Sequence, residues 1–339
     1  MLLPQSNTEA PLSEDRRVLG YLERREKEGL IARNAVRLAG DASTRQYYRV
    51  TTDEESLILA LWPESFDPDS LAFLNVAELL VAIPVRIPVI HHVSGPEGIL
   101  MLEDLGDELL QKRTNEVDRA QKLLLYREAV SILGRLQARG AELRDQRFFP
   151  YRIAFDEAKL FEELVFFEEH FIAGFRQSML SGEERETLRG VFRAIASELA
   201  GRPRVLCHRD YHSRNLMVTK GELAVIDFQD ARMGPVTYDL VSLLRDSYVE
   251  HDLDFVAEMI EEFRRGTDSP GFESEFDLMA LQRNLKALGT FGFQISVNDS
   301  EVYRPYVTTT LEMVRRNLAG SRRWDGLRKT LSRHLPEVA

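Results

Sequence analysis

The chain has 339 residues, of which 44% are hydrophobic and 29% charged, the composition of a globular protein of about two domains. This composition excludes disorder, collagen and coiled coil as descriptions of the whole chain. Lys and Arg number 44 and Asp and Glu 55, so the formal net charge is −11, and we expect neither nucleic acid nor membrane as a partner because both require a basic surface. Cys207 is the single cysteine, the start is not signal-like, and no apolar stretch reaches about 20 residues. We therefore expect a cytoplasmic protein, whose oligomeric state stays open with a monomer slightly favoured.

The N-terminal part of the chain is predicted to be rich in strands. Short apolar runs between turn signals predict three strands, at 35–38, 47–50 and 57–62. A helix at 70–80 follows, and then a hairpin around the sequence SGPEG.

From residue 106 onward, helical patterns dominate the chain. The predicted helices lie at 118–140, 156–176, 183–200, 236–249, 252–265, 275–295 and 301–319. A strand-rich segment at 204–228 interrupts them. We predict an α+β fold with two lobes, a small β-rich N-terminal lobe at 1–105 and a larger, mostly helical C-terminal lobe at 106–339.

The strand-rich segment contains the spacing H-x-D-x-x-x-x-N, in which Asp210 and Asn215 are the acid and the amide. A hairpin follows and ends at Asp227. Phosphoryl transfer to an alcohol needs a carboxylate that accepts or orients the hydroxyl proton, and oxygen ligands that hold Mg²⁺ against the phosphates. One loop can present Asp210 and Asn215, and the hairpin returns the chain so that Asp227 can approach the same metal.

With these motifs and this order of lobes, the chain resembles the aminoglycoside phosphotransferase and choline kinase-like family, which has a protein-kinase-like fold. The resemblance implies that Asp210 is the catalytic base and that Asn215 and Asp227 are metal ligands. It implies ATP and Mg²⁺ as cofactors and a small molecule as the acceptor. It also implies that the N-terminal lobe binds the nucleotide and that the C-terminal lobe binds the acceptor.

Residues 40–50 read GDASTRQYYRV and resemble the first hairpin of bacterial anomeric amino-sugar kinases. Those enzymes phosphorylate N-acetylmuramate and N-acetylglucosamine at C1 during cell-wall recycling. A tight turn between two strands lets backbone N–H groups and hydroxyls face a phosphate. The predicted cofactor-binding residues of this turn are Gly40, Asp41, Ala42, Ser43, Thr44 and Arg45.

The third predicted strand reads LILALW and lacks the lysine with which most of these kinases hold the α- and β-phosphates. Anomeric amino-sugar kinases also tend to lack this lysine. Arg45 and Arg49 share one face of the second strand and are candidates to replace it, with solvated edge arginines as the alternative. Residues 101–106 resemble the hinge of the family, where the main chain of Glu103 and Leu105 is the candidate for binding adenine.

The candidate substrate-binding residues are Asp210, Arg214, Asp230 and Arg283. For Arg283, Asn284 and Lys286, on the predicted helix 275–295, a solvated face is favoured over an acceptor pocket. Two alternatives stay open beside the amino-sugar kinase. One is a kinase with another acceptor, such as an aminoglycoside, another hexosamine, choline or ethanolamine. The other is a nucleotide-binding pseudokinase, for which the missing lysine is the best support.

Overall fold

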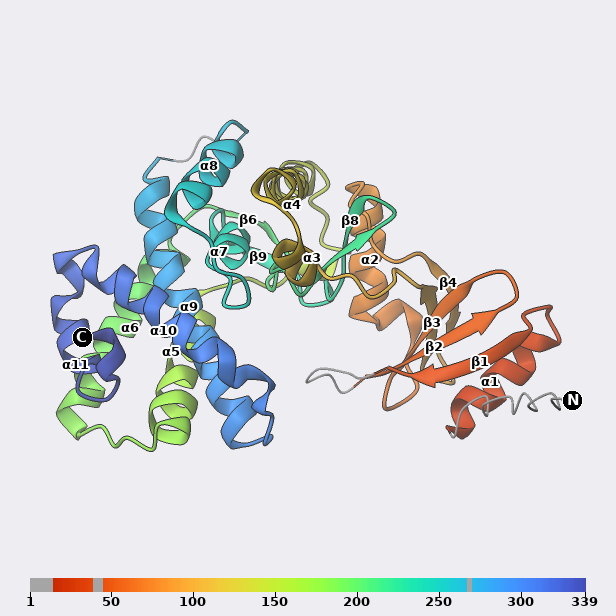
Figure 1. Ribbon diagram of the computed structural model, residues 1–339, viewed down its shortest axis with the longest axis horizontal. Coiled ribbons are helices and arrows are strands. Elements are labelled where there is room, and N and C mark those ends of the chain that lie inside the picture. The colour runs from red at the N-terminus through yellow and green to blue at the C-terminus, as the bar shows by residue number, and fades with distance from the viewer. Residues whose placement is uncertain (1–14, 39–44, 267–269) are drawn as a thin grey trace, which may run out of the picture. The chain divides into compact units, whose positions relative to one another are not determined.

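The structure, a computed structural model, describes residues 15–38, 45–266 and 270–339 (Figure 1). The chain divides into two compact units. The first consists of Met1–Leu74 and Ile87–Gly106, and the second of Asn75–Arg86 and Asp107–Ala339. The functional division into lobes at 105/106 stays a prediction. Within the described ranges, no helix is long and apolar enough to cross a membrane.

The first unit is built on a five-stranded antiparallel sheet of order β1-β2-β3-β5-β4. Its strands are β1 (Ala32–Arg37), β2 (Gln46–Thr52), β3 (Ser56–Leu61), β4 (Ile90–Ser94) and β5 (Ile99–Glu103). All the predicted strands are confirmed, with ends that differ by a few residues. The other elements of this part of the chain are α1 (Arg16–Glu26), η1 (Pro68–Ser70) and α2 (Ala72–Ala82). From Asn75 onward, α2 belongs to the second unit.

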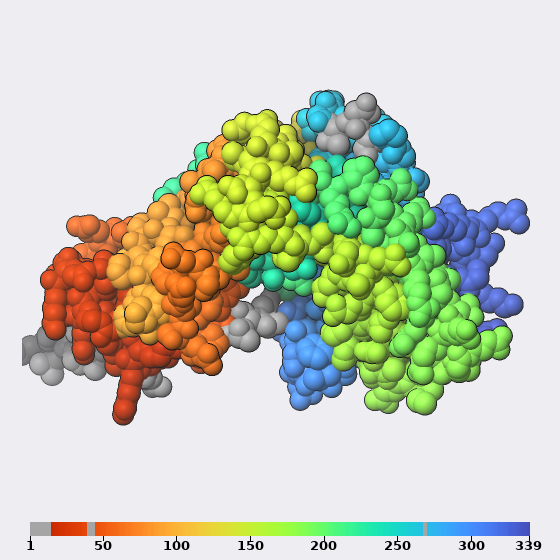
Figure 2. All heavy atoms as spheres, turned by 180° about the vertical axis from the view of Figure 1, so that it is seen from behind, coloured from red at the N-terminus to blue at the C-terminus, as the bar shows by residue number. Residues whose placement is uncertain are grey.

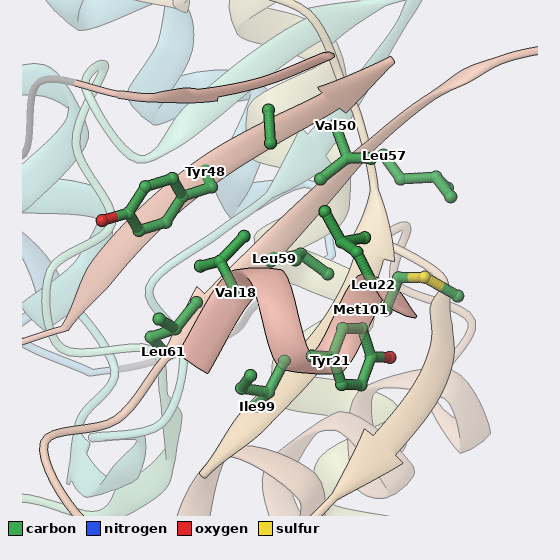
Figure 3. Packing of buried hydrophobic residues seen from close by; sticks show 11 residues of the cluster. Val18, Tyr21, Leu22, Tyr48, Val50, Leu57, Leu59, Leu61, Ile99 and Met101 are labelled. Atoms are coloured by element: carbon green, nitrogen blue, oxygen red, sulfur yellow. The ribbon is translucent and has the colours of Figure 1, made fainter. Parts of the chain in front are cut away.

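One face of this sheet is apolar and packs against α1 (Figure 3). Alternate residues of β2 and β3, such as Tyr48, Val50 and Leu59, are buried because successive side chains of a strand point to opposite faces. Tyr21 and Leu22 of α1 meet them in the same cluster. The apolar runs that predicted the strands therefore supply the residues of this core.

The second unit is mostly helical. Its helices are α3 (Leu110–Glu116), α4 (Arg119–Glu142), α5 (Glu157–Phe166), the π-helix η3 (Phe167–Phe175), α6 (Gly182–Ala200), α7 (Tyr238–Leu244), α8 (Leu253–Arg264), α9 (Phe272–Ser296), α10 (Arg304–Ala319) and α11 (Asp325–Leu331). Short 3₁₀ turns are η2 (Phe149–Tyr151), η4 (Glu301–Tyr303), η5 (Arg322–Trp324) and η6 (Pro336–Val338). Two pairs of short strands are antiparallel. In one, β6 (Arg204–Cys207) pairs with β9 (Arg232–Pro235), and in the other, β7 (Leu216–Thr219) pairs with β8 (Glu222–Val225). The sequence prediction missed α3, α11 and β9, which are short.

The helix predicted at 156–176 is in fact α5 followed by η3. Helix α9 packs closely against η3. Figure 2 shows α5, η3 and α6 side by side in yellow-green and green. The close approach requires glycine at two positions of α9. A Cβ at Gly289 would lie 2.9 Å from the Cα of Phe167, and one at Gly292 would lie 2.7 Å from the carbonyl carbon of His170.

We expect Gly292→Ala to lower the free energy of unfolding by about 1–3 kcal/mol, because its methyl group would force α9 away from the backbone of η3. Gly190→Ala is the matched control, since Gly190 lies on α6 and an added Cβ there would meet no atom within 4 Å. That control is expected to raise the free energy of unfolding by up to about 1 kcal/mol. Urea unfolding of both variants measures the difference, and equal stabilisation by both would contradict the close packing of α9 on η3.

Candidate active site

The loop 208–215 connects β6 to β7, and buried carboxylates hold its backbone. The amides of His208 and Arg209 donate to the two oxygens of Asp239, at 2.6 and 3.0 Å. The amide of Ser213 donates to Asp246 at 2.9 Å. Arg209 has a φ of 89°, in the left-handed region that side chains rarely adopt. Asp239 therefore supports the backbone of the loop at Arg209, the residue with the left-handed φ.

Asp239 and Asp246 are buried, and they were missed by the sequence analysis. Burial raises the pKa of Asp239, although hydrogen bonds from the loop amides oppose the shift. Burial also raises the pKa of Asp246, to about 6, against the lowering effect of its hydrogen bonds. The available signal for Asp239 was an acid inside the mostly apolar run YDLVSLL, because a carboxylate buried in such a run needs hydrogen-bond donors around it.

The structure brings Asn215 and Asp227 to the same end of the β7–β8 hairpin as Asp210. Leu216 pairs with Val225, and the amide of Ile226 donates to the carbonyl of Asn215 at 3.0 Å. The side-chain amide of Asn215 donates to the carbonyl oxygen of Asp210 at 2.8 Å. Asp227 follows directly after Ile226, with a φ of 61°.

The oxygen atoms of Asn215 and Asp227 fit a magnesium ion. Because the nitrogen of the Asn215 amide donates to Asp210, its oxygen is turned away from that bond. An amide oxygen and a carboxylate are hard ligands, and Mg²⁺ commonly takes one or two of these and completes its shell with water and phosphate. Over the described residues, no group of three or more His, Cys, Asp or Glu side chains could hold a metal.

Asp210 lies among positive charges. The Lys286 ammonium donates to its Oδ1 at 2.8 Å, and an Arg283 nitrogen lies 3.7 Å from the same oxygen. The Arg209 Nε lies 3.7 Å from Oδ2. Burial acts to raise the pKa of Asp210, but Lys286, Arg283 and Arg209 together hold it well below its usual range. Asp210 is therefore a carboxylate at any physiological pH.

The face of α9 that was favoured as solvated is in fact buried. Asn284 is 2% exposed, and the side chains of Arg283 and Lys286 are 9% and 15% exposed. All three line a cavity of about 100 Å³ that also has Asp210 in its wall. The prediction of a solvated face is wrong because the helix that carries these residues is surrounded by packed elements on most sides.

The other candidate substrate residues lie near this cavity but do not line it. The guanidinium of Arg214 lies over the ring of Tyr248, a cavity residue, at 4.8 Å from the ring centre. Asp230 forms an ion pair with Arg209 at 2.8 Å and is half-exposed. The structure thus places only Asp210 and Arg283 of the four candidates in the cavity wall.

In the first unit, the five residues 40–44 of the predicted phosphate-binding turn lie outside the described residues. Arg45 is described, and its guanidinium lies over the rings of Trp62 and Tyr47, at 5.5 and 5.9 Å. Arg49 forms an ion pair with Asp104 at 2.6 Å, within the partly buried face of β2. Arg49 lies on the face of β2 opposite to the core, whereas Arg45 precedes the first residue of the strand.

The predicted hinge lies at the end of β5. The amide of Glu103 donates to the carbonyl of Val89 at 2.8 Å, and the side chain of Glu103 accepts from the amide of Val89 at 3.2 Å. The amide of Leu105 has no hydrogen-bond partner among the residues that the structure describes. It retains the capacity to donate to a ligand.

Cys207 precedes the loop on β6 and is fully buried. Burial raises the pKa of its thiol well above the ordinary value, with the charge of Asp239 acting in the same direction. The thiol is therefore protonated and forms part of the core, as the sequence favoured, rather than acting as a nucleophile.

Three features together define a protein-kinase-like phosphotransferase. They are a loop with an aspartate and an asparagine five residues apart, a hairpin that ends in a second aspartate, and a preceding five-stranded antiparallel sheet. The model of the phosphotransferase enzyme family matches residues 34–274, and the chain belongs to this family. The predicted membership and the α+β two-lobe fold class are confirmed.

Curated relatives cover most of the chain. It is 30% identical over 292 residues to an N-acetylmuramate/N-acetylglucosamine kinase of Neisseria meningitidis serogroup B, which spans 82% of this chain and 84% of the relative. A protein with the same name from Pseudomonas aeruginosa is 31% identical and covers 75% of this chain and 74% of its own length.

Solved structures with low identity show the same fold. The gentamicin complex of APH(2")-IIa has a TM-score of 0.64 at 14% identity and covers 90% of this chain and 99% of its own. The choline kinase LicA from Streptococcus pneumoniae has a TM-score of 0.59 at 14% identity, with coverage of 89% and 99%.

We expect Asp239→Asn to lower the free energy of unfolding by about 2 kcal/mol, because one of the two loop amides would lose its acceptor in a buried site. We also expect kcat to fall by about 10-fold or more, since a shift of the loop displaces Asp210. Asp299→Asn is the control, because Asp299 is exposed and its left-handed backbone suits asparagine. Native stability and activity in Asp239→Asn would show that the loop does not depend on this carboxylate.

Proposed function

We propose that this protein is an ATP-dependent kinase that transfers the γ-phosphate to the anomeric C1 hydroxyl of an N-acetylated amino sugar, N-acetylmuramate or N-acetylglucosamine. One observation carries the proposal. Four curated relatives, at 24–31% identity over most of the chain, share the name N-acetylmuramate/N-acetylglucosamine kinase. Because the reaction consumes ATP, we expect it to take place in the cytoplasm.

The charges of the cavity support an amino sugar that is neutral or anionic. Its charged walls carry three cations, Arg245, Arg283 and Lys286, against the two acids Asp210 and Asp246. Since the pKa of Asp246 is raised to about 6 by burial, the balance becomes more positive as the pH falls toward that value. An aminoglycoside with several ammonium groups would meet like charges here, and like charges without water between them repel strongly.

In the proposed reaction, Asp210 orients the hydroxyl of the sugar. The hydroxyl oxygen attacks the γ-phosphorus, the bond from that phosphorus to the bridging oxygen of ADP breaks, and the hydroxyl proton passes to Asp210 and then to solvent. A carboxylate with a low pKa is a weak base, so its main contribution is to orient the nucleophile. An anomeric hydroxyl is more acidic than an ordinary alcohol, which suits a weak base.

Asn215 and Asp227 would hold Mg²⁺, which when bound neutralises the charge of the phosphates. The phosphates would also meet the backbone of residues 40–45, while Arg45 and Arg49 are the candidates to compensate for the absent lysine. The main chain of Glu103 and Leu105 would bind adenine. Arg214, Asp230 and Arg283 would contribute to the binding of the sugar.

A panel of acceptors with ATP and Mg²⁺ tests the proposed function. We expect turnover of N-acetylmuramate and N-acetylglucosamine, with a product in which NMR detects coupling between phosphorus and the anomeric proton. We expect no turnover of kanamycin or choline, because the cavity is cationic. Faster phosphorylation of either cation would overturn the acceptor assignment, and no turnover of any acceptor would favour the pseudokinase.

Asp210→Asn is expected to lower kcat by about 10²–10⁴-fold, because the amide cannot accept the hydroxyl proton. The Kd for ATP, measured by calorimetry, is expected to change by less than about threefold, since Asp210 acts on the acceptor. Asp254→Asn, an exposed aspartate on α8, serves as the control and is expected to retain native turnover. Near-native kcat in Asp210→Asn would remove Asp210 from the mechanism.

Chelation tests the metal assignment separately. Excess EDTA is expected to abolish turnover, and added Mg²⁺ to restore it, because ATP reaches the site as its magnesium complex. Asn215→Ala and Asp227→Ala are expected to raise the Mg²⁺ concentration needed for half-maximal rate by about 10-fold or more. An unchanged Mg²⁺ requirement in both variants would contradict their role as ligands.

A further inference from the structure

Lys286 is the nearest cation to the carboxylate of Asp210, although 76 residues separate them in the sequence. Its ammonium donates to Oδ1 at 2.8 Å, and its side chain is only 15% exposed. Lys286 belongs to α9, the helix that Gly289 and Gly292 dock directly onto η3. The lysine therefore projects from a rigid element and not from a mobile loop.

The two oxygens of Asp210 have different surroundings. Oδ1 accepts from Lys286, and Arg283 lies 3.7 Å from the same atom. For Oδ2, the nearest cation is Arg209 at 3.7 Å, which is beyond hydrogen-bond distance. Across the described ranges, Oδ2 has no hydrogen-bond partner, while the residue is 25% exposed and lines the cavity. Oδ2 is thus the oxygen that can still accept a hydrogen bond.

We propose that Lys286 is a positioning residue for phosphoryl transfer, which holds Oδ1 of Asp210 so that Oδ2 is presented to the hydroxyl of the acceptor. The proposal rests on the proposed function, in which Asp210 orients that hydroxyl. An orientation error of about 1 Å at such a group costs about 10²-fold in rate, so fixing one oxygen has a measurable consequence.

The Arg283 nitrogen nearest to Oδ1, Nη1, is beyond hydrogen-bond distance of it and is engaged elsewhere. The Arg283 guanidinium donates to the hydroxyl of Tyr238 at 2.7 Å and lies 4.6 Å from the centre of that ring. Burial lowers the pKa of Lys286, and the negative charge of Asp210 opposes the shift. Each of the two charges therefore offsets part of the cost of burying the other.

Several charged or titratable groups face Asp210 from the elements around it, and all of them remain in the variants below. They are Arg209 and His212 of the loop, Tyr238 of α7, and Arg283 of α9. Glu163 of α5 acts on the same cations and accepts from Gln282 at 2.9 Å. Replacement of Lys286 alone therefore removes the hydrogen bond to Oδ1 and leaves these other groups in place.

The test compares Lys286→Met with Lys286→Arg in the full-length enzyme. Met has nearly the same length without the charge, and we expect it to lower kcat by about 10²-fold while KM for ATP and for the acceptor changes less than about twofold. Lys286→Arg retains the charge and a donor for Oδ1, so we expect it to keep kcat within about 10-fold of the native value.

Lys329→Met is the matched control, because Lys329 is an exposed lysine of α11. A lowered melting temperature of Lys286→Met with native kcat would overturn the proposal in favour of a structural role. A raised KM for the acceptor with unchanged kcat would overturn it in favour of direct substrate binding. These two results can be told apart from a failure of the proposed function. If the native enzyme itself phosphorylates no acceptor, the proposed function fails, and the role of Lys286 fails with it.

Discussion

The active-site loop depends on two carboxylates buried beneath it. A buried carboxylate costs several kcal/mol unless hydrogen bonds compensate for the lost water. Asp239 obtains this compensation from the amides of His208 and Arg209, and Asp246 from those of Ser213 and Tyr248. Because these donors are backbone groups, the carboxylates fix the path of the main chain, and the positions of Asp210 and Asn215 follow from that path.

A second constraint brings α9 to the loop. The glycines at 289 and 292 let the helix approach the backbone of η3 more closely than any side chain would permit. The same helix carries Arg283 and Lys286 on a neighbouring part of its surface, where they reach Asp210. The packing of two helices far from the motif in sequence thus determines the charge around its central aspartate.

The features predicted correctly from the sequence are those that depend on the spacing of residues close together in the chain. Short apolar runs between turn signals predicted the five strands of the first unit. The motif from Asp210 to Asn215 predicted the class of enzyme, because a loop of that length can present both groups. The sequence did not predict the partner of Asp210. Lys286 and Arg283 follow the spacing of a solvated helix face, and only the packing of α9 against its neighbours buries them. Asp239 was missed for the same reason, since its donors lie about 30 residues earlier in the chain.

The net charge of −11 has the opposite sign to the surroundings of Asp210. Arg209, Arg283 and Lys286 approach this one carboxylate, so an acidic protein contains a locally cationic site. In water such charges would be screened over about 10 Å, but in a partly buried cavity they act strongly on whatever enters. Under the proposed function, this local field would disfavour the cationic substrates that the overall charge would attract. Overall charge concerns solubility and non-specific contacts, whereas under the proposed function the selectivity of this site would depend on a few side chains of α9 and the loop.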